Sequence, residues 1–347
     1  HDDKMFESLI DMIYDLYKNR SDKLKTLDEE RSKEPNWCYR NDSITMQLYV
    51  EKYAKNLRGI ESKLDYLQKL GIKFIYALPF LRSPPEKSDG GFACSDYRNV
   101  RDDLGTIEDL EYLINALHAR GMCFIMDFVI NHSSDEHEWA KRAKKGEIEY
   151  QNRYYFYDSW YIPNQFDSYG VMGHFFGDIA PDNFTFVPEC QKIVMTTFHS
   201  YQWDLNYRNP VVFNQMLNNI LYIMNRGVDI IVFNGTSNLW KKPGTSCRNL
   251  PQAYIINQII NLAMEVVCPG CAASFDIKRH KNRELIDDTT HIRLAKNTVK
   301  NLTNNDQNEE NEYDDESESE NENDFVITES GVLTADAAAD INYSKKV

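Results

Sequence analysis

The chain has 347 residues, which is too long for one small module and predicts two domains or one large barrel. Hydrophobic residues make up 42% and aromatic residues 12%, which is enough to bury a core and excludes a wholly disordered chain. The net charge of −15 is unfavourable for contact with phosphate backbones and anionic lipids, so we expect neither nucleic acid nor a membrane as a partner.

The N-terminus and the cysteines bear on the location of the protein. The first residues, HDDKMFESLI, are charged and lack the basic and apolar regions of a signal peptide, although the start at His1 suggests that a segment precedes them. Seven scattered cysteines, an odd number, favour reduced thiols and a cytoplasmic location. Cys268-Pro-Gly-Cys271 has redox or zinc spacing but stands alone, so we favour a helix-ending loop over metal or redox chemistry.

Residues 1–60 are predicted to form a helical N-terminal region, because apolar residues recur three and four apart in FESLIDMIYDLYKN. A second amphipathic helix, KNLRGIESKLDYLQKLGI, is predicted to end at Gly71, and a third starts at the N-cap Thr106 and stops at Gly121. The apolar runs KFIYALPF, MCFIMDFVI, VDIIVF and CAASFDI alternate with such helices. Strands without polar alternation are buried on both faces, which predicts an α/β fold with a parallel sheet or barrel.

About 75 residues between the strand that ends near Asn131 and the helix that starts near Asn209 lack this pattern. They are rich in Tyr, Phe, Trp, Asp and Pro, and they are too many for a connecting loop. We therefore predict an inserted subdomain over residues 132–208, between barrel segments 61–131 and 209–300. Insertions in barrels lie at the carboxyl ends of strands, where active sites are built.

The end of the chain is acidic. Residues 306–324 hold eleven Asp and Glu and no Lys or Arg, so residues 301–347 are predicted to be a disordered, Asn-rich acidic tail. A solvated spacer is the simplest interpretation of this tail. The alternative is a segment that captures a basic protein partner.

Polar side chains stand at the carboxyl ends of the predicted strands or in the loop that follows the first of them. They are Asp89, Asp96, Asp127, Asn131, His132, Asn234 and Asp276. One such residue would most simply cap a turn. Because they recur at successive strands of a predicted barrel, we expect most of them to share a pocket.

The sequence around these residues resembles amylosucrase, of the α-amylase superfamily (glycoside hydrolase family 13). DFVINH resembles the general strand-3 motif of the superfamily, whereas QWDLNYRNP and GTSCRNLPQA are specific to amylosucrase-like members. The resemblance extends over about residues 1–280. It implies a (β/α)8 TIM barrel with the subdomain inserted after strand 3, of which only about five βα units are visible here.

The resemblance also implies a retaining double displacement on sucrose, with an Asp nucleophile after strand 4 and a Glu acid/base after strand 5. Asn234 occupies the nucleophile position, Val232 that of the Arg that orients it, and Asp276 that of the Glu. A carboxamide is not a workable nucleophile, and Asp is one methylene shorter than Glu. The third carboxylate of the family has no counterpart, so the resemblance implies a truncated and inactive member.

The resemblance also implies that a set of sugar-binding residues is retained. Its residues are Asp89, Phe92, Asp127, Asn131, His132, Phe198 and Gln202. They imply sucrose or another α-glucoside as the ligand, with no cofactor and no metal. The alternative is that these side chains only pack the inserted subdomain.

Other interpretations stay open. A weakly active sucrose hydrolase or glucosyltransferase would need Asp229 or Glu284 to replace the lost carboxylate, although we expect Asp229 near the bottom of the barrel. An interaction protein would act through its acidic tail, and a partner or a second copy would cover the open edges of an incomplete barrel. Asn234-Gly235 is also the dipeptide context most open to deamidation, which would restore Asp at the nucleophile position.

Overall fold

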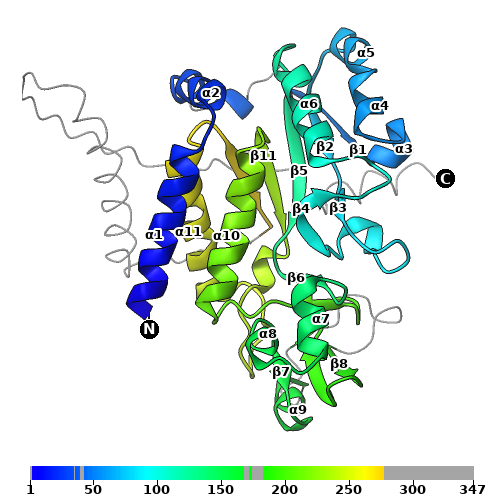
Figure 1. The fold of residues 1–347 in the computed structure, drawn as a ribbon, viewed down its shortest axis with the longest axis vertical. Helices are drawn as coiled ribbons and strands as arrows, with labels where there is room; N and C mark the ends of the chain where they lie inside the picture. Colours follow the sequence, from blue (N-terminus) through cyan, green and yellow to red (C-terminus); the bar gives the residue numbers. More distant parts are fainter. Residues whose placement is uncertain (1, 35, 40–42, 168–171, 174–182, 277–347) are drawn as a thin grey trace, which may run out of the picture. The chain divides into compact units, whose positions relative to one another are not determined.

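The computed structural model describes residues 2–34, 36–39, 43–167, 172–173 and 183–276, and its central feature is one parallel sheet (Figure 1). The sheet has five strands in the order β1-β2-β5-β11-β12, which is also their order along the chain. Their bounds are Ile44–Leu48 (β1), Ile72–Ala77 (β2), Cys123–Val129 (β5), Ile230–Asn234 (β11) and Ala272–Phe275 (β12). All four pairings are parallel, and helices lie on the connections, so the described part has the topology of the first five units of a (β/α)8 barrel. The predicted fold class is confirmed.

The inner strands are apolar on both faces, as their unbroken hydrophobic runs predicted. In β5 the residues from Phe124 to Val129 are all buried. Phe128 lies opposite Phe233 of β11 in the register, and the two rings meet edge to face with centroids 6.0 Å apart. Phe233 also stacks on Phe275 of β12 at 4.9 Å. These aromatic pairs each add roughly 0.5–1.5 kcal/mol beyond burial, and they connect three neighbouring strands, β5, β11 and β12.

The main helices include the one predicted to start at Thr106 and to stop at Gly121. They are α1 (Asp2–Lys18), α2 (Asp22–Ser32), α6 (Ile107–His118), α10 (Pro210–Met224) and α11 (Pro251–Val267). Thr106 caps α6 through reciprocal hydrogen bonds with Asp109 of 3.2 and 3.0 Å, and the chain turns after the helix at Gly121 with φ +63°. Proline occupies the first position of α10 and α11, where its missing N–H costs nothing. Helix α1 packs against both α10 and α11.

The prediction of a wholly helical region over residues 1–60 was wrong in one part, because β1 lies within it. The strand ITMQL is the outer strand beside β2, and four of its five residues are exposed or half-buried. It therefore has no apolar run by which to be found. The helix predicted to end at Gly71 is also divided. It forms α4 (Leu57–Glu61) and α5 (Leu64–Lys69), after the short helix α3 (Val50–Ala54).

The segment between β5 and α10 has its own secondary structure. Its elements are β6 (His132–Ser134), α7 (Glu138–Lys144), α8 (Ile148–Gln151), β7 (Phe156–Tyr157), α9 (Tyr161–Asp167), β8 (Phe184–Val187), β9 (Lys192–Met195) and β10 (Gln202–Asp204). Strands β7, β9 and β8 form an antiparallel sheet over a separate core that includes Phe166, Phe184 and Met195. Strand β6 pairs with β10, which returns the chain to the end of β5. The boundaries 61–131, 132–208 and 209–300 stay predictions.

The remaining elements are short. They are η1 (Trp37–Tyr39), β3 (Leu81–Arg82), η2 (Asp89–Gly91), β4 (Asp96–Val100) and η3 (Thr236–Asn238). Within the described ranges, no helix is long and apolar enough to cross a bilayer. The outer strands of the sheet are β1 and β12, and a partner or second copy that covers them stays a prediction. Glu284 and the predicted tail over residues 301–347 lie outside the described residues.

Candidate functional site

Asp127 and Asn234 meet at the carboxyl ends of β5 and β11. The Asn234 amide donates a hydrogen bond of 2.6 Å to Oδ1 of Asp127, and the Tyr76 hydroxyl donates one of 2.7 Å to the same oxygen. The second oxygen, Oδ2, is buried and has no hydrogen-bond partner among the described residues. Burial raises the pKa of Asp127 to about 6, against the two hydrogen bonds, which lower it. This carboxyl group therefore has one acceptor atom without a partner, and its pKa lies above the ordinary value for Asp.

Val232 lies two residues before Asn234 and opposite Asp127 in the register. Side chains at i and i+2 of a strand share one face, so all three side chains face the same side of the sheet. A valine there supplies no positive charge beside Asp127.

His132 lies just beyond β5, and its side chain is buried. Its ring packs against Phe198 with centroids 5.1 Å apart, and Asn131 Nδ2 lies 3.3 Å from His132 Nδ1. Burial lowers the pKa of His132 to about 4, although the charges of Asp204 and Asp89 act to raise it. His132 Nε2 is buried and makes no hydrogen bond of ordinary geometry in the described part of the chain, although the Phe92 backbone also acts to raise the pKa of His132. The imidazole is therefore neutral at pH 7 and offers one ring nitrogen to a ligand.

A buried ion pair holds the loop after β11 against this region. Lys241 Nζ lies 2.7 Å from Asp204 Oδ2, and both side chains are 0% exposed. The same ammonium donates to Asn131 Oδ1 at 3.2 Å and to the Thr197 hydroxyl at 2.9 Å. Thr197 in turn donates its backbone N–H to Asp204 Oδ1 at 3.2 Å. Every charge in the cluster is matched, so it fixes Asn131, and with it the neighbouring His132, in place.

Lys241 and Asp204 were not predicted as parts of the site. Lys241 stands beside Lys242 in the sequence, and only the structure shows that the first is buried and the second exposed. Asp204 lies in the string QWDLNYRNP, which carried the resemblance, and that string was the one available signal.

Gln202 and Asp89 join the site from β10 and from the loop after β2. Gln202 Nε2 donates to Asp89 Oδ2 at 3.0 Å, and its Oε1 accepts a bond of 2.9 Å from the His199 backbone. Asp89 has a positive φ of 50° and its side chain is partly exposed. Phe92 ends the same turn and is half-buried. The structure thus brings Asp89 and Gln202 together.

Asp276 serves as a cap. Its carboxylate accepts hydrogen bonds from the backbone N–H groups of Thr236 (2.6 Å) and Gly235 (3.1 Å) and from the Thr236 hydroxyl. Desolvation raises the pKa of Asp276, and these bonds act against that rise. Both oxygens are thus committed to the turn that follows Asn234. Gly235 is needed there, because it has φ +79° and a Cβ would lie 2.7 Å from the Cβ of Asn131.

Two further carboxylates do not join the pocket. Asp96 begins β4 and binds the backbone of Arg98 and the amide of Asn99, so the simple capping interpretation holds for it. Asp229 lies at the opposite, amino-terminal end of β11, as expected, and is 1% exposed. It accepts bonds from Arg31 (2.6 Å), His118 (2.9 Å) and the Phe124 backbone (2.7 Å). Burial acts to raise its pKa, but the His118 hydrogen bond and the Arg31 charge leave the pKa of Asp229 lowered.

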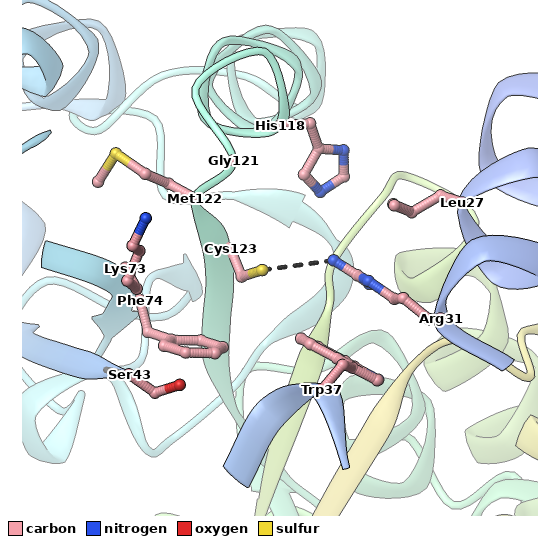
Figure 2. A pocket seen from close by; sticks show the side chains of 10 residues that line it. All are labelled: Leu27, Arg31, Trp37, Ser43, Lys73, Phe74, His118, Gly121, Met122 and Cys123. Carbon is pink, nitrogen blue, oxygen red and sulfur yellow. Dashed lines mark hydrogen bonds between the residues drawn. The ribbon is translucent and has the colours of Figure 1, made fainter. Parts of the chain in front are cut away.

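A cavity of about 300 Å³ lies at this amino-terminal end, as Figure 2 shows. Arg31, His118 and Cys123 line it, together with the stacked pair of Trp37 and Phe74. Arg31 points across it to the Cys123 sulfur at 3.3 Å. None of the residues predicted to bind sugar lines this cavity. The described residues contain no group of three or more His, Cys, Asp or Glu side chains arranged to hold a metal ion.

Comparison with known proteins gives the family. Residues 30–341 match the family described as alpha amylase, catalytic domain. The trehalose synthase/amylase TreS of Mycolicibacterium smegmatis is 33% identical over 216 residues, which are 62% of this chain and 35% of that protein. An alpha-glucosidase of Pediococcus pentosaceus is 34% identical over 192 residues, which are 54% of this chain and 32% of the relative.

Among solved structures, the isomaltulose synthase SmuA from Protaminobacter rubrum aligns with a TM-score of 0.59 and 24% identity, over 68% of this chain and 44% of that one. This likeness supports the barrel fold. The chain spans about a third of the length of the curated relatives that it matches. The family match covers most of the chain, the sheet has the barrel topology, and polar side chains gather at its carboxyl end, so the chain belongs to the alpha-amylase family.

Proposed function

We propose that this chain is an amylosucrase-like member of the alpha-amylase family that binds sucrose or a related α-glucoside without turning it over. The observation that carries the proposal is the contact between Asn234 and Asp127. At the position where the resemblance implies a nucleophilic carboxylate, a neutral amide donates a hydrogen bond of 2.6 Å to its neighbour.

The chemistry of retention explains why this arrangement is unsuited to turnover. A retaining glycosidase needs two carboxyl groups about 5–5.5 Å apart, one of them an ionised nucleophile and the other an acid. The Asn234 amide is a poor nucleophile, and it does not offset the positive charge that develops on the sugar. At the acid/base position, the Asp276 carboxylate is bonded to Gly235 and Thr236.

Binding is supported by the polar atoms that the fold leaves without partners. Asp127 Oδ2 and His132 Nε2 are both buried and lack hydrogen-bond partners within the described ranges. Burying a polar atom without a partner costs about 1–3 kcal/mol, and a sugar hydroxyl could satisfy either atom because it both donates and accepts. The half-buried rings of Phe92 and Phe198 supply apolar surface for a pyranose face.

The weakly active alternative finds little support in the carboxylates that are described. Asp229 is saturated by Arg31, His118 and Phe124 at the other end of its strand. Restoration of Asp by deamidation is also opposed. Succinimide closure needs the Gly235 nitrogen to attack the Asn234 side chain, yet that N–H donates to Asp276 and that amide donates to Asp127.

The proposal is tested by incubating the full chain with sucrose while free glucose, fructose and polymer are measured, with calorimetry on the same preparation. We expect binding heat and no product above that of a heat-killed control. Sucrose turnover above that control would overturn the proposal and support the weakly active alternative. The absence of both heat and product would remove sugar binding and leave the interaction role of the acidic tail.

A further inference from the structure

Cys268 and Cys271 stand at the two corners of one tight turn between α11 and β12. The backbone N–H of Cys271 donates to the Cys268 carbonyl at 2.9 Å, which closes a four-residue turn with Pro269 and Gly270 at its centre. Such a turn holds its first and last Cα atoms within about 7 Å, and a disulfide spans Cα separations of about 4.4–6.8 Å. The neighbouring Cys271 thiol and burial both raise the pKa of Cys268. The backbone of the turn therefore brings the two cysteines within the Cα separation that a disulfide requires.

Helix α2 and Arg20, which lies two residues before the helix starts, hold this turn in place. Asp28 Oδ1 accepts a hydrogen bond of 3.1 Å from the Gly270 N–H, and Arg31 donates one of 3.2 Å to the Gly270 carbonyl. Arg20, paired with Asp28 at 2.6 Å, donates to the Cys271 sulfur at 3.6 Å. A Cβ on Gly270 would lie only 2.6 Å from the Cα of Asp28, so the turn fits closely against the helix. The dithiol is thus preorganised by contacts from a distant part of the chain.

The two thiols differ in exposure. Cys271 is half-buried, whereas Cys268 is fully buried. A third thiol, Cys123, lines the cavity in Figure 2 and receives a hydrogen bond from Arg31, but burial raises its pKa to about 12. The part of the chain that the structure describes offers these cysteines no set of metal ligands. Disulfide exchange therefore suits the pair better than metal binding.

We propose that Cys268 and Cys271 form a reversible disulfide by exchange with a small disulfide of the glutathione class. Cys271, the more accessible of the two thiols, reacts first: its thiolate attacks one sulfur of the small disulfide, forms a mixed disulfide and releases one small thiol. Cys268 then attacks the Cys271 sulfur and releases the second small thiol. Two S–H bonds break and one S–S bond forms in the protein, while the oxidant is reduced to two thiols that carry away both protons. The bond joins the end of α11 to the start of β12, and it does not depend on sugar binding.

The test equilibrates the native full chain with buffers of increasing oxidised-to-reduced glutathione ratio, followed by alkylation of free thiols and mass analysis. One tryptic peptide, residues 249–278, contains both cysteines and no others. We expect this peptide to escape alkylation and to lose about 2 Da, for its two hydrogen atoms, and to regain both thiols on reduction.

Single substitutions assign the order of the two steps. Cys268→Ser should stop the exchange at the mixed disulfide, with glutathione retained on Cys271. Cys271→Ser should leave Cys268 unmodified, and the control Cys94→Ser should behave as the unaltered chain. Two alkylated cysteines in the peptide at every ratio would overturn the proposal, as would pairing of Cys271 with Cys123.

Discussion

The buried carboxylates at the two ends of the five-stranded sheet differ in their hydrogen-bond partners and in the direction of their pKa shifts. At the amino-terminal end, Asp229 receives three hydrogen bonds and its pKa is lowered. At the carboxyl end, Asp127 keeps one buried oxygen without a partner, and its pKa is raised to about 6. A buried carboxylate whose oxygens have their hydrogen-bond partners stabilises the fold. A buried carboxylate oxygen without a partner costs free energy, and a ligand that donates a hydrogen bond to it removes that cost. We therefore expect the amino-terminal end of the sheet to serve stability and the carboxyl end to hold the ligand proposed above.

The largest effect is expected at the structural end. Replacement of Asp229 by Ala leaves Arg31 and the Phe124 N–H without their acceptor, and removal of one member of a buried ion pair costs about 3–5 kcal/mol. The loss is measured as the free energy of unfolding in urea. Asp102→Asn is the control, because the Asp102 side chain is 82% exposed, and it should change stability by about 0.5 kcal/mol or less. A loss no larger than that of the control would contradict the structural role of Asp229.

The next effect concerns pH and Asp127. Its pKa is 3.8 ordinarily and about 6 in the folded chain, so the folded state holds the proton more tightly than the unfolded state. The resulting stability is fully present below pH 3.8 and is lost as the pH rises through 6, by about 3 kcal/mol in total. Asp127→Asn removes this titration. The difference in free energy of unfolding between the two proteins should therefore change by about 3 kcal/mol or slightly less between pH 4 and 7. A difference that stays constant over this range would contradict a raised pKa for Asp127.

The smallest effect is expected for repair of the nucleophile alone. Asn234→Asp combined with Val232→Arg restores the two residue types that the resemblance implies, but it leaves Asp276 bonded to Gly235 and Thr236. The carboxylate at the acid/base position would still have both oxygens hydrogen-bonded to the turn, so we expect no measurable sucrose turnover. Glucose release by the double variant, above that of the unaltered chain, would show that the defect is confined to those two positions.

The sequence predicted features that depend on unbroken patterns. The apolar runs of β2, β5 and β11, the cap at Thr106 and the place of Asp229 all follow from periodicity and chain order. Strand β1 was missed because an outer strand is partly exposed and carries no apolar run. Lys241 was missed because its burial depends on Asp204, which lies 37 positions earlier in the chain and across the site.

The position of a residue in the sequence also did not determine its role in the structure. Asp276 stands where the resemblance implies an acid/base, yet in the structure its oxygens cap the turn after Asn234. Asp127 and Asn234 were both expected in the pocket, but their hydrogen bond depends on strand register, which a single sequence does not encode locally.

The contrast between the two ends is tested most directly by sucrose calorimetry on two single variants. His132→Ala removes the neutral ring with the free Nε2 at the carboxyl end, and Lys73→Ala alters the cavity at the amino-terminal end. We expect His132→Ala to weaken sucrose binding by about 10-fold or more, the effect of one lost buried hydrogen bond, and Lys73→Ala to leave it unchanged. The reverse result, with binding lost only in Lys73→Ala, would contradict the assignment of the carboxyl end as the binding end.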